Sequence, residues 1–365
     1  MVDMELSADK RVEWDIGTAY DFFISLWALH EPEQLGLRGS WAAGVRSRLP
    51  GPERDILQRV TPLVWPLPWV YTLPAPKDAR AALDALRALK PEERLLALTP
   101  SAPEHVVVVW REVAERGSWN ESDQKRLVDE LVSSDWRKHP TAVVRKAAGG
   151  FLDLWANPAE TADALLSAYE CYQEVFFAEE EGRIRPALEA GLARAKMLAG
   201  RTRQWDTLLE ELSQGVRVAK DWENKTLILA PSYWGTPLAL MADFAPDKLL
   251  FLFGARPADE SLIPGEVVPD ALYQALKALA DPTRLRILRY LSEEPLTPAE
   301  LARRLRLRSP TVIHHLDALR LARLVIVTLE HEGKRYAVRP DAVAAVFDWL
   351  NQFLVGREEL DQSVS

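Results

Sequence analysis

The chain has 365 residues, of which 48% are hydrophobic and 27% charged, a balance typical of folded proteins and not of disordered ones. At about 100–200 residues per domain, this length predicts two or three domains. The single cysteine, Cys171, excludes an internal disulfide framework and a metal site built from several cysteines. We find neither an uncharged apolar segment of the roughly 18 residues that a membrane span needs nor a signal peptide, so we expect a cytoplasmic protein.

The net charge of −9 is distributed unevenly along the chain. Residues 271–355 contain 13 Lys or Arg and 9 Asp or Glu, whereas residues 1–270 contain 31 and 42. An acidic body would itself repel nucleic acid, but a basic segment attached to it is typical of a DNA-binding module.

The first two thirds of the chain read as mainly helical. Residues 12–30 predict a short strand followed by an apolar helix, and residues 36–76, rich in proline and tryptophan, predict short helices joined by turns. Between 78 and 197, apolar residues recur at spacings of three and four, which predicts a series of helices. Two short apolar runs, at 226–230 and 248–255, predict strands.

The chain is therefore predicted to be mainly α and to consist of two parts. An α-helical region with a small β element covers residues 1–260. A link with proline and glycine, residues 256–269, leads to a C-terminal domain at residues 268–355.

The C-terminal domain begins with the helix LYQALKALA, which ends at Asp281-Pro282. Asp281 is expected to cap the next helix, with Pro282 at its first position, where the missing N–H costs nothing. That helix, TRLRILRYL, is expected to bury Leu285, Leu288 and Leu291 along one stripe.

The next helix, PAELARRL, starts with a capping box in which Thr297 accepts from an N–H and Glu300 reaches back. After a tight turn at residues 306–308, Ser309 is expected to cap a further helix, with Pro310 at its first position. The inner face of this helix, which runs to residue 322, is predicted to carry Val312, Leu316 and Leu319.

Two apolar runs, LVIVTL and RYAV, then predict a β-hairpin that turns at Gly333. Three short helices that close on such a hairpin, the last of them set by a tight turn, make a winged helix-turn-helix domain. The helix at 310–322 would enter the major groove, and its outward-facing candidates for DNA contact are Ser309, Thr311, His314 and His315.

Basic residues around this helix are candidates for phosphate contacts, which give affinity but little sequence information. They are Arg303, Arg304, Arg306, Arg308, Arg320 and Arg323. At the wing, Lys334 and Arg335 could reach the minor groove or the backbone, and Glu330 and Glu332 beside them weaken that case.

The segments ADPTRLRILRYL, LTPAELARRLRL, SPTVIHHLDALRLARLV and GKRYAV, taken in this order, resemble the ArsR family of winged-helix repressors. The resemblance covers about 75 residues, roughly a fifth of the chain. It implies a sequence-specific transcriptional regulator, more specifically a repressor, that binds a palindromic operator as a homodimer and is released from DNA by an inducer.

Some positions depart from the family pattern. The founding members sense metals through cysteines on the helix that corresponds to residues 297–305, and none occurs here, so we expect neither metal sensing nor a cofactor. Arg308 and Ile313 stand where the family often has serine, so base readout by these two positions does not follow from the resemblance. Thr311, His314 and His315 keep the common pattern.

The N-terminal region is expected to sense a small-molecule effector or a partner, or to hold the dimer. Twelve of the thirteen tryptophans lie there, and a plain hydrophobic core accounts for most of them. Tyr233 and Trp234, in a loop after a predicted strand, are the sequence's only candidates for ligand contacts.

We find no catalytic motif and predict that the protein is not an enzyme. Two alternatives stay open. The winged helix could be a protein-interaction module, or the N-terminal region could be an enzyme with a DNA-binding tail.

Overall fold

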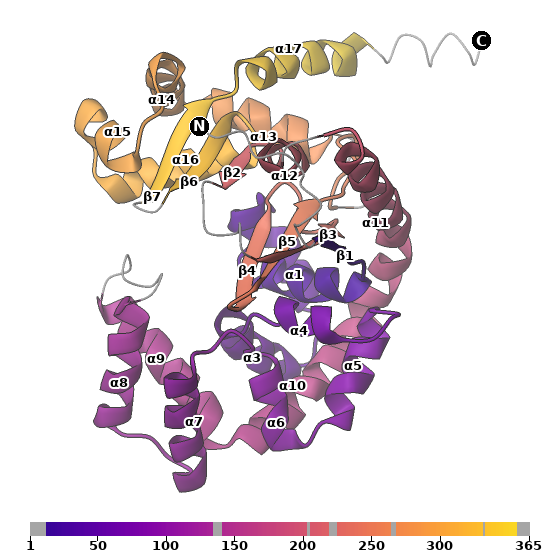
Figure 1. Cartoon of the computed structure of the whole chain (residues 1–365), viewed down its shortest axis with the longest axis vertical. Helices are drawn as coiled ribbons and strands as arrows, with labels where there is room; N and C mark the ends of the chain where they lie inside the picture. Colours follow the sequence, from indigo (N-terminus) through magenta and orange to yellow (C-terminus); the bar gives the residue numbers. More distant parts are fainter. Residues whose placement is uncertain are drawn as a thin grey trace.

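The computed structural model describes residues 12–133, 141–202, 205–218, 225–263, 268–330 and 333–355. We call residues 12–263 the body and residues 268–355 the winged-helix region. The chain is mainly α-helical, as predicted, and Figure 1 shows the winged-helix region at one end of the long axis and helices α6–α8 at the other, with a small sheet between them. No helix in the described ranges is long and apolar enough to cross a membrane.

The helices of the body, in chain order, are α1 (Thr18–His30), η1 (Pro32–Leu35), α2 (Gly39–Arg46), α3 (Gly51–Val60), η2 (Thr61–Leu63), α4 (Leu67–Thr72), α5 (Ala79–Ala88), α6 (Pro91–Ala97), α7 (Glu104–Arg116), α8 (Glu121–Ser133), α9 (Thr141–Ala156), α10 (Pro158–Tyr172), η4 (Gln173–Phe177), α11 (Ala178–Ala199) and α12 (Trp205–Ser213). Its strands are β1 (Val12–Trp14), β2 (Val216–Val218), β3 (Thr226–Ser232), β4 (Leu240–Ala245) and β5 (Lys248–Gly254).

The sheet of the body has the strand order β1-β3-β5-β4, in which β1, β3 and β5 are parallel and β4 is antiparallel to β5. Both faces of β3 are buried: Ile228 and Ala230 join the helical core around α1, and Leu227 and Leu229 join a cluster built on α12. Burial on both faces explains why the strand reads as a continuous apolar run. The strands predicted at 226–230 and 248–255 are confirmed; β4 was missed, since LMADFA includes alanines and an aspartate, which are poor strand formers.

Aromatic side chains fill much of the helical core, which fits the structural interpretation of the tryptophans. The rings of Trp110 and Trp155 stack with centroids 4.7 Å apart, and those of Trp41 and Trp234 with centroids 5.7 Å apart. Such pairs contribute beyond their buried area.

The winged-helix region contains α13 (Asp270–Leu279), α14 (Pro282–Glu293), α15 (Pro298–Leu305), α16 (Ser309–Leu321), β6 (Val325–Glu330), β7 (Gly333–Val338) and α17 (Pro340–Val355). It has a hydrophobic core of its own, to which every one of these elements contributes. From α17 only Val346 is buried in it, and the other face of that helix is exposed. Two of the predicted caps are confirmed: Asp281 accepts a 2.9 Å hydrogen bond from the Arg284 N–H, and Thr297 and Glu300 form a complete capping box.

Two local predictions were wrong. Leu285 is 49% exposed, and Ile287 takes its place in the core with Leu288 and Leu291. At about 100° per residue, Leu285 lies roughly 110° around the helix from the centre of that stripe. Ser309 does not cap α16 but is its first residue, and the cap position is Arg308, whose side chain makes no capping bond. Pro310 is tolerated one position further in, because the N–H groups of the first turn have no helical partner.

The body also supplies a strand to the winged-helix region. β2 pairs in parallel with β6, which makes a three-stranded sheet in the order β2-β6-β7. The Val327 N–H donates to the Gly215 carbonyl at 2.8 Å. The predicted domain boundaries, 1–260 and 268–355, stay a prediction. The strand β2 belongs to the first of these ranges, but it pairs within the sheet of the second.

Candidate nucleic-acid interface

The position of α16 is fixed by the turn before it and by the core beneath it. Arg306 ends α15 in a left-handed conformation, with φ of 57°, and lets the chain turn into α16. Val312, Leu316 and Leu319 are buried, as predicted, so the opposite face of α16 is directed to solvent. This arrangement leaves one face of α16 exposed, which is the geometry that a helix-turn-helix domain needs in order to contact a DNA groove.

Ser309, Thr311 and His314 are exposed on α16, as predicted from the sequence. Ile313 is exposed as well, with 41% of its surface accessible. The free N-terminal N–H groups and partial positive charge of a helix favour phosphate groups nearby. The first two turns of α16 therefore combine hydrogen-bonding side chains with one apolar side chain.

The predicted outward orientation of His315 was wrong. Only 15% of its side chain is exposed, and its Nδ1 lies 3.9 Å from Asp281 Oδ1 at the start of α14. Burial lowers the pKa of His315, with an opposing contribution from Asp281. His315 lies only about 60° around the helix from buried Val312, which explains why it packs inward.

The arginines of the predicted phosphate set have different surroundings. Arg303, Arg306 and Arg308 are exposed. Arg304 donates to Glu294 at 2.6 Å, and Arg320 lies 3.8 Å from Asp317, so both have acidic neighbours. The exposed three are the better phosphate candidates, since ion pairs must be weakened before the others can bind DNA.

Arg323 does not join that set. It follows α16 in a turn, with φ of 57°, and its Nε is buried. Burial, together with the positive charges of Arg256, Arg339 and Arg194, lowers the pKa of Arg323 to about 10. Its side chain therefore belongs to the junction with the body.

At the wing, Lys334 is opposite Leu329 and Arg335 is opposite Thr328. Arg335 is held near α15: its Nη1 donates to the Pro295 carbonyl at 3.1 Å and lies 3.6 Å from Glu300. Glu332 lies outside the described residues. The wing is thus tied to the cap of α15, and Lys334 is its exposed basic residue.

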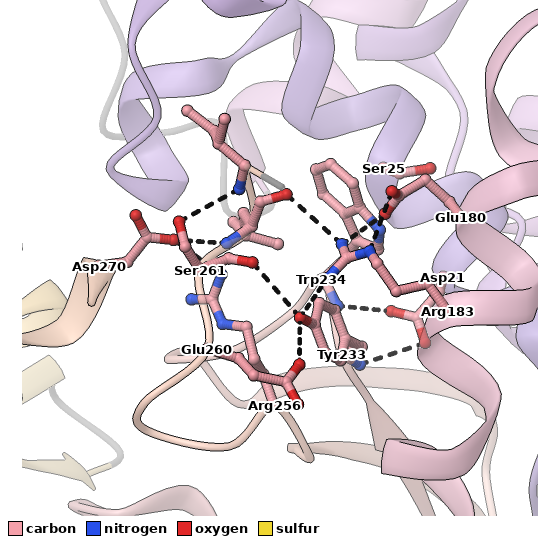
Figure 2. A network of polar contacts seen from close by, with 12 residues as sticks. Asp21, Ser25, Glu180, Arg183, Tyr233, Trp234, Arg256, Glu260, Ser261 and Asp270 are labelled. Atoms are coloured by element: carbon pink, nitrogen blue, oxygen red, sulfur yellow. Dashed lines mark hydrogen bonds and ion pairs between the residues drawn. The ribbon is translucent and has the colours of Figure 1, made fainter. Parts of the chain in front are cut away.

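Tyr233 and Trp234, the ligand candidates, lie in a turn after β3, but both side chains are fully buried. Asp21 holds this turn in place: it accepts from the Trp234 N–H at 2.7 Å (Figure 2). It also accepts from the Ser232 hydroxyl at 2.7 Å. Burial raises the pKa of Asp21 to about 6. The turn was predicted correctly, and the burial leaves the two side chains without an accessible surface for a ligand in this structure.

A polar network continues from Tyr233 to the winged-helix region (Figure 2). The Tyr233 hydroxyl donates to Glu260 at 2.7 Å and accepts from Arg183 at 2.6 Å. Arg256 pairs with Asp270, the first residue of α13, at 3.1 Å. No sequence pattern predicts this network, because its members are distant in the chain and meet only through the fold.

Among the described residues, no group of three or more His, Cys, Asp or Glu side chains is arranged to hold a metal ion. Ile313 and Arg256 are the functional candidates that sequence reasoning missed. One sequence feature pointed to Ile313: it stands where the family often has serine, on a helix that was expected to face DNA.

Comparison with known proteins places the similarity in this part of the chain. The family described as bacterial regulatory protein, arsR family, matches residues 281–327. The HTH-type transcriptional regulator CmtR of Mycobacterium tuberculosis is 38% identical over 90 residues, which are 25% of this chain and 76% of that protein. The HTH-type transcriptional regulator Rv2034 of the same species is 39% identical over 85 residues, 23% of this chain and 77% of that protein.

Proposed function

This chain belongs to the arsR family of bacterial regulatory proteins, and we propose on that basis that it is a dimeric, ligand-responsive repressor of transcription that acts on DNA in the cytoplasm. DNA-binding regulation is the function that the family match supports directly. The observation that carries the proposal is the solvent-directed face of α16, with Ser309, Thr311 and His314 at its N-terminal end.

In this proposal α16 lies in the major groove. Thr311 and His314 contact base edges, where donor and acceptor patterns distinguish the base pairs. Arg303, Arg308 and Lys334 bind phosphates and set the position of the helix on the duplex. Arg304, Arg320 and Arg335 contribute less, because each has an acidic partner.

The surface of α17 supports the dimer. Only Val346 of this apolar helix is fully buried, whereas Phe347 and Leu354 are 58% and 64% exposed. α17 packs on α13, from which Tyr273 is also exposed. A second copy of the chain that covers this face through a two-fold axis would bring two copies of α16 to the two halves of a palindrome.

The body is proposed to control this activity and to have no catalytic role of its own. It is joined to the winged-helix region through β2 and through the Arg256–Asp270 ion pair. A ligand that binds one arrangement of the two parts better than another would shift the population and change the affinity for DNA.

The test is fluorescence anisotropy of the full chain with the duplex upstream of its own gene and with a scrambled duplex, over a range of salt concentrations. The proposal expects the native duplex to be favoured by about 10³-fold or more. Equal, weak binding to both duplexes would contradict an operator function and favour a protein-interaction role for the winged helix.

A further inference from the structure

A small cavity lies where the body meets the winged-helix region. It is lined by Thr236 and Arg256, which follow β3 and β5, by Glu260, and by Gln274, Leu321 and Arg323 from the winged-helix region. β3 and β5 are parallel, so both end at the same edge of the sheet. The carboxyl edge of parallel strands is where open α/β sheets generally bind ligands.

Arg323 is the unusual residue of this cavity. Within the described residues its side chain makes no hydrogen bond or ion pair, and its Nε is buried. The charged groups that act on it are Arg256, Arg339 and Arg194, and no carboxylate is among them. The rest of the residue is partly buried, and a largely desolvated cation without a partner is unfavourable, so a negative charge at this site would be stabilised.

The acidic residues of the cavity do not meet that demand. Asp270 pairs with Arg256 at 3.1 Å and accepts from the Leu262 N–H at 2.7 Å. Glu260 accepts from the Tyr233 hydroxyl at 2.7 Å (Figure 2). Both carboxylates are therefore engaged on the body side of the cavity.

We propose that this cavity is an effector site for a small oxyanion, a phosphate or carboxylate group, held by the guanidinium of Arg323. The inference rests on the proposed ligand-responsive function and names the ligand class and the site. The planar guanidinium fork suits the two oxygens of such a group, and the desolvated surroundings strengthen the attraction.

The position of Arg323 links the site to DNA binding. Arg323 lies two residues after the end of α16, and its carbonyl accepts a 3.2 Å hydrogen bond from Arg339, which also donates to the Gln214 carbonyl of the body at 2.6 Å. The cavity holds only about 20 Å³, room for about one water molecule. An oxyanion must therefore widen the junction, and it favours an arrangement in which α16 has moved relative to the body.

The probes are inorganic phosphate and acetate, each compared with chloride at equal ionic strength in thermal melts and titration calorimetry of the full chain. The variants are Arg323→Gln, Arg323→Lys and, as a matched control, Arg80→Gln, which removes the same charge from an exposed site of the body. Binding and thermal stabilisation by phosphate but not by acetate indicate a phosphate ligand. Binding and thermal stabilisation by acetate but not by phosphate indicate a carboxylate ligand.

The wild type and Arg80→Gln are expected to bind one of the two anions and to melt at a higher temperature in its presence. Arg323→Gln is expected to weaken that binding by about tenfold or more and Arg323→Lys by less, since an ammonium keeps the charge but not the fork. Without anion, Arg323→Gln should melt no lower than the wild type. Failure of the wild type to bind either anion, or an equal loss of binding in Arg80→Gln, overturns the proposal.

Operator affinity separates this inference from the proposed function. In the wild type the bound anion should weaken operator binding about tenfold beyond the chloride control, and in Arg323→Gln it should not. Specific operator binding that no anion changes would overturn the effector site and leave the DNA-binding function intact. Loss of specific binding in the anion-free wild type would instead contradict the proposed function.

Discussion

Arg339 and Arg323 are joined by a hydrogen bond in which Arg339 Nη1 donates to the Arg323 carbonyl oxygen at 3.2 Å, and the same nitrogen donates to the Gln214 carbonyl at 2.6 Å. One guanidinium thus connects the residue after α16, the residue before α17 and the turn before β2. The connection lies beside the β2–β6 pairing, so the body and the winged-helix region share both a sheet and a side-chain clamp.

Replacing the clamp should destabilise the fold. Arg339→Met keeps the apolar stem and leaves two half-buried carbonyl groups without their donor, for which we expect a loss of about 1–3 kcal/mol in the free energy of unfolding. Urea denaturation measures it. The control is Arg217→Met, which removes an exposed ion pair with Glu210 and should cost no more than about 1 kcal/mol. Equal losses in the two variants would mean that Arg339 is only another surface arginine.

Ile313 should contact the methyl group of a thymine in the operator. It is exposed on the face of α16 that is proposed to enter the groove, and the apolar partner that the major groove offers is the thymine C5-methyl group. Replacing operator thymines with deoxyuridine one at a time should weaken wild-type binding at one or two positions. Ile313→Ser should bind the thymine and deoxyuridine duplexes equally well at those positions. A wild type that is indifferent to every deoxyuridine would disprove the contact.

Arg308 and His314 should differ in how they affect DNA binding. Arg308→Gln is expected to weaken native and scrambled duplexes alike and to reduce the salt slope by about one unit, as loss of a phosphate contact does. His314→Ala is expected to lower affinity for the native duplex alone, by about 1–3 kcal/mol. Arg80→Gln, at an exposed position of the body, is the control and should change neither quantity. A reversal of the two patterns in the anisotropy assay would refute these roles.

Asp21 should make stability depend on pH. Burial raises its pKa to about 6 in the folded state, above the ordinary value of 3.8, so the folded protein binds this proton more tightly than the unfolded chain. The contribution is fully present below about pH 4 and is lost as the pH rises through 6, by about 3 kcal/mol in total.

Asp21→Asn isolates this contribution because it cannot ionise. The difference in unfolding free energy between the wild type and Asp21→Asn should shrink between pH 4 and pH 7. Denaturation at several pH values measures it, and a difference that is constant or grows with pH would contradict the assignment.

Local signals explain what the sequence predicted correctly. Asp281 and the Thr297–Glu300 pair are caps whose partners lie three residues away, and the inner face of α16 follows from spacing alone. Such short-range patterns located the helices α13 to α16 and the hairpin.

Long-range contacts explain the errors. Leu285 and His315 each lie at the edge of a buried face of their helix. Whether a residue at such an edge is buried depends on which neighbouring elements pack against it. Arg323 reads as part of a basic run, but the body closes over it, and β2 is too short to be recognised before its partner β6 is known. Tyr233 and Trp234 look like loop residues because the buried carboxylate that holds them, Asp21, lies more than 200 residues earlier in the chain.

The central claim, that α16 enters the groove of an operator, is tested most directly by cleavage from a tethered reagent. Cys171 is the chain's only cysteine, so Cys171→Ser combined with Thr311→Cys gives a single attachment point for an iron chelate on α16. We expect the chelate to cleave the DNA at only two sites, which lie about one or a few whole turns of the DNA helix apart. A chelate attached through Arg80→Cys should cause no cleavage. Operator binding without cleavage from position 311, or the same cleavage from position 80, would contradict it.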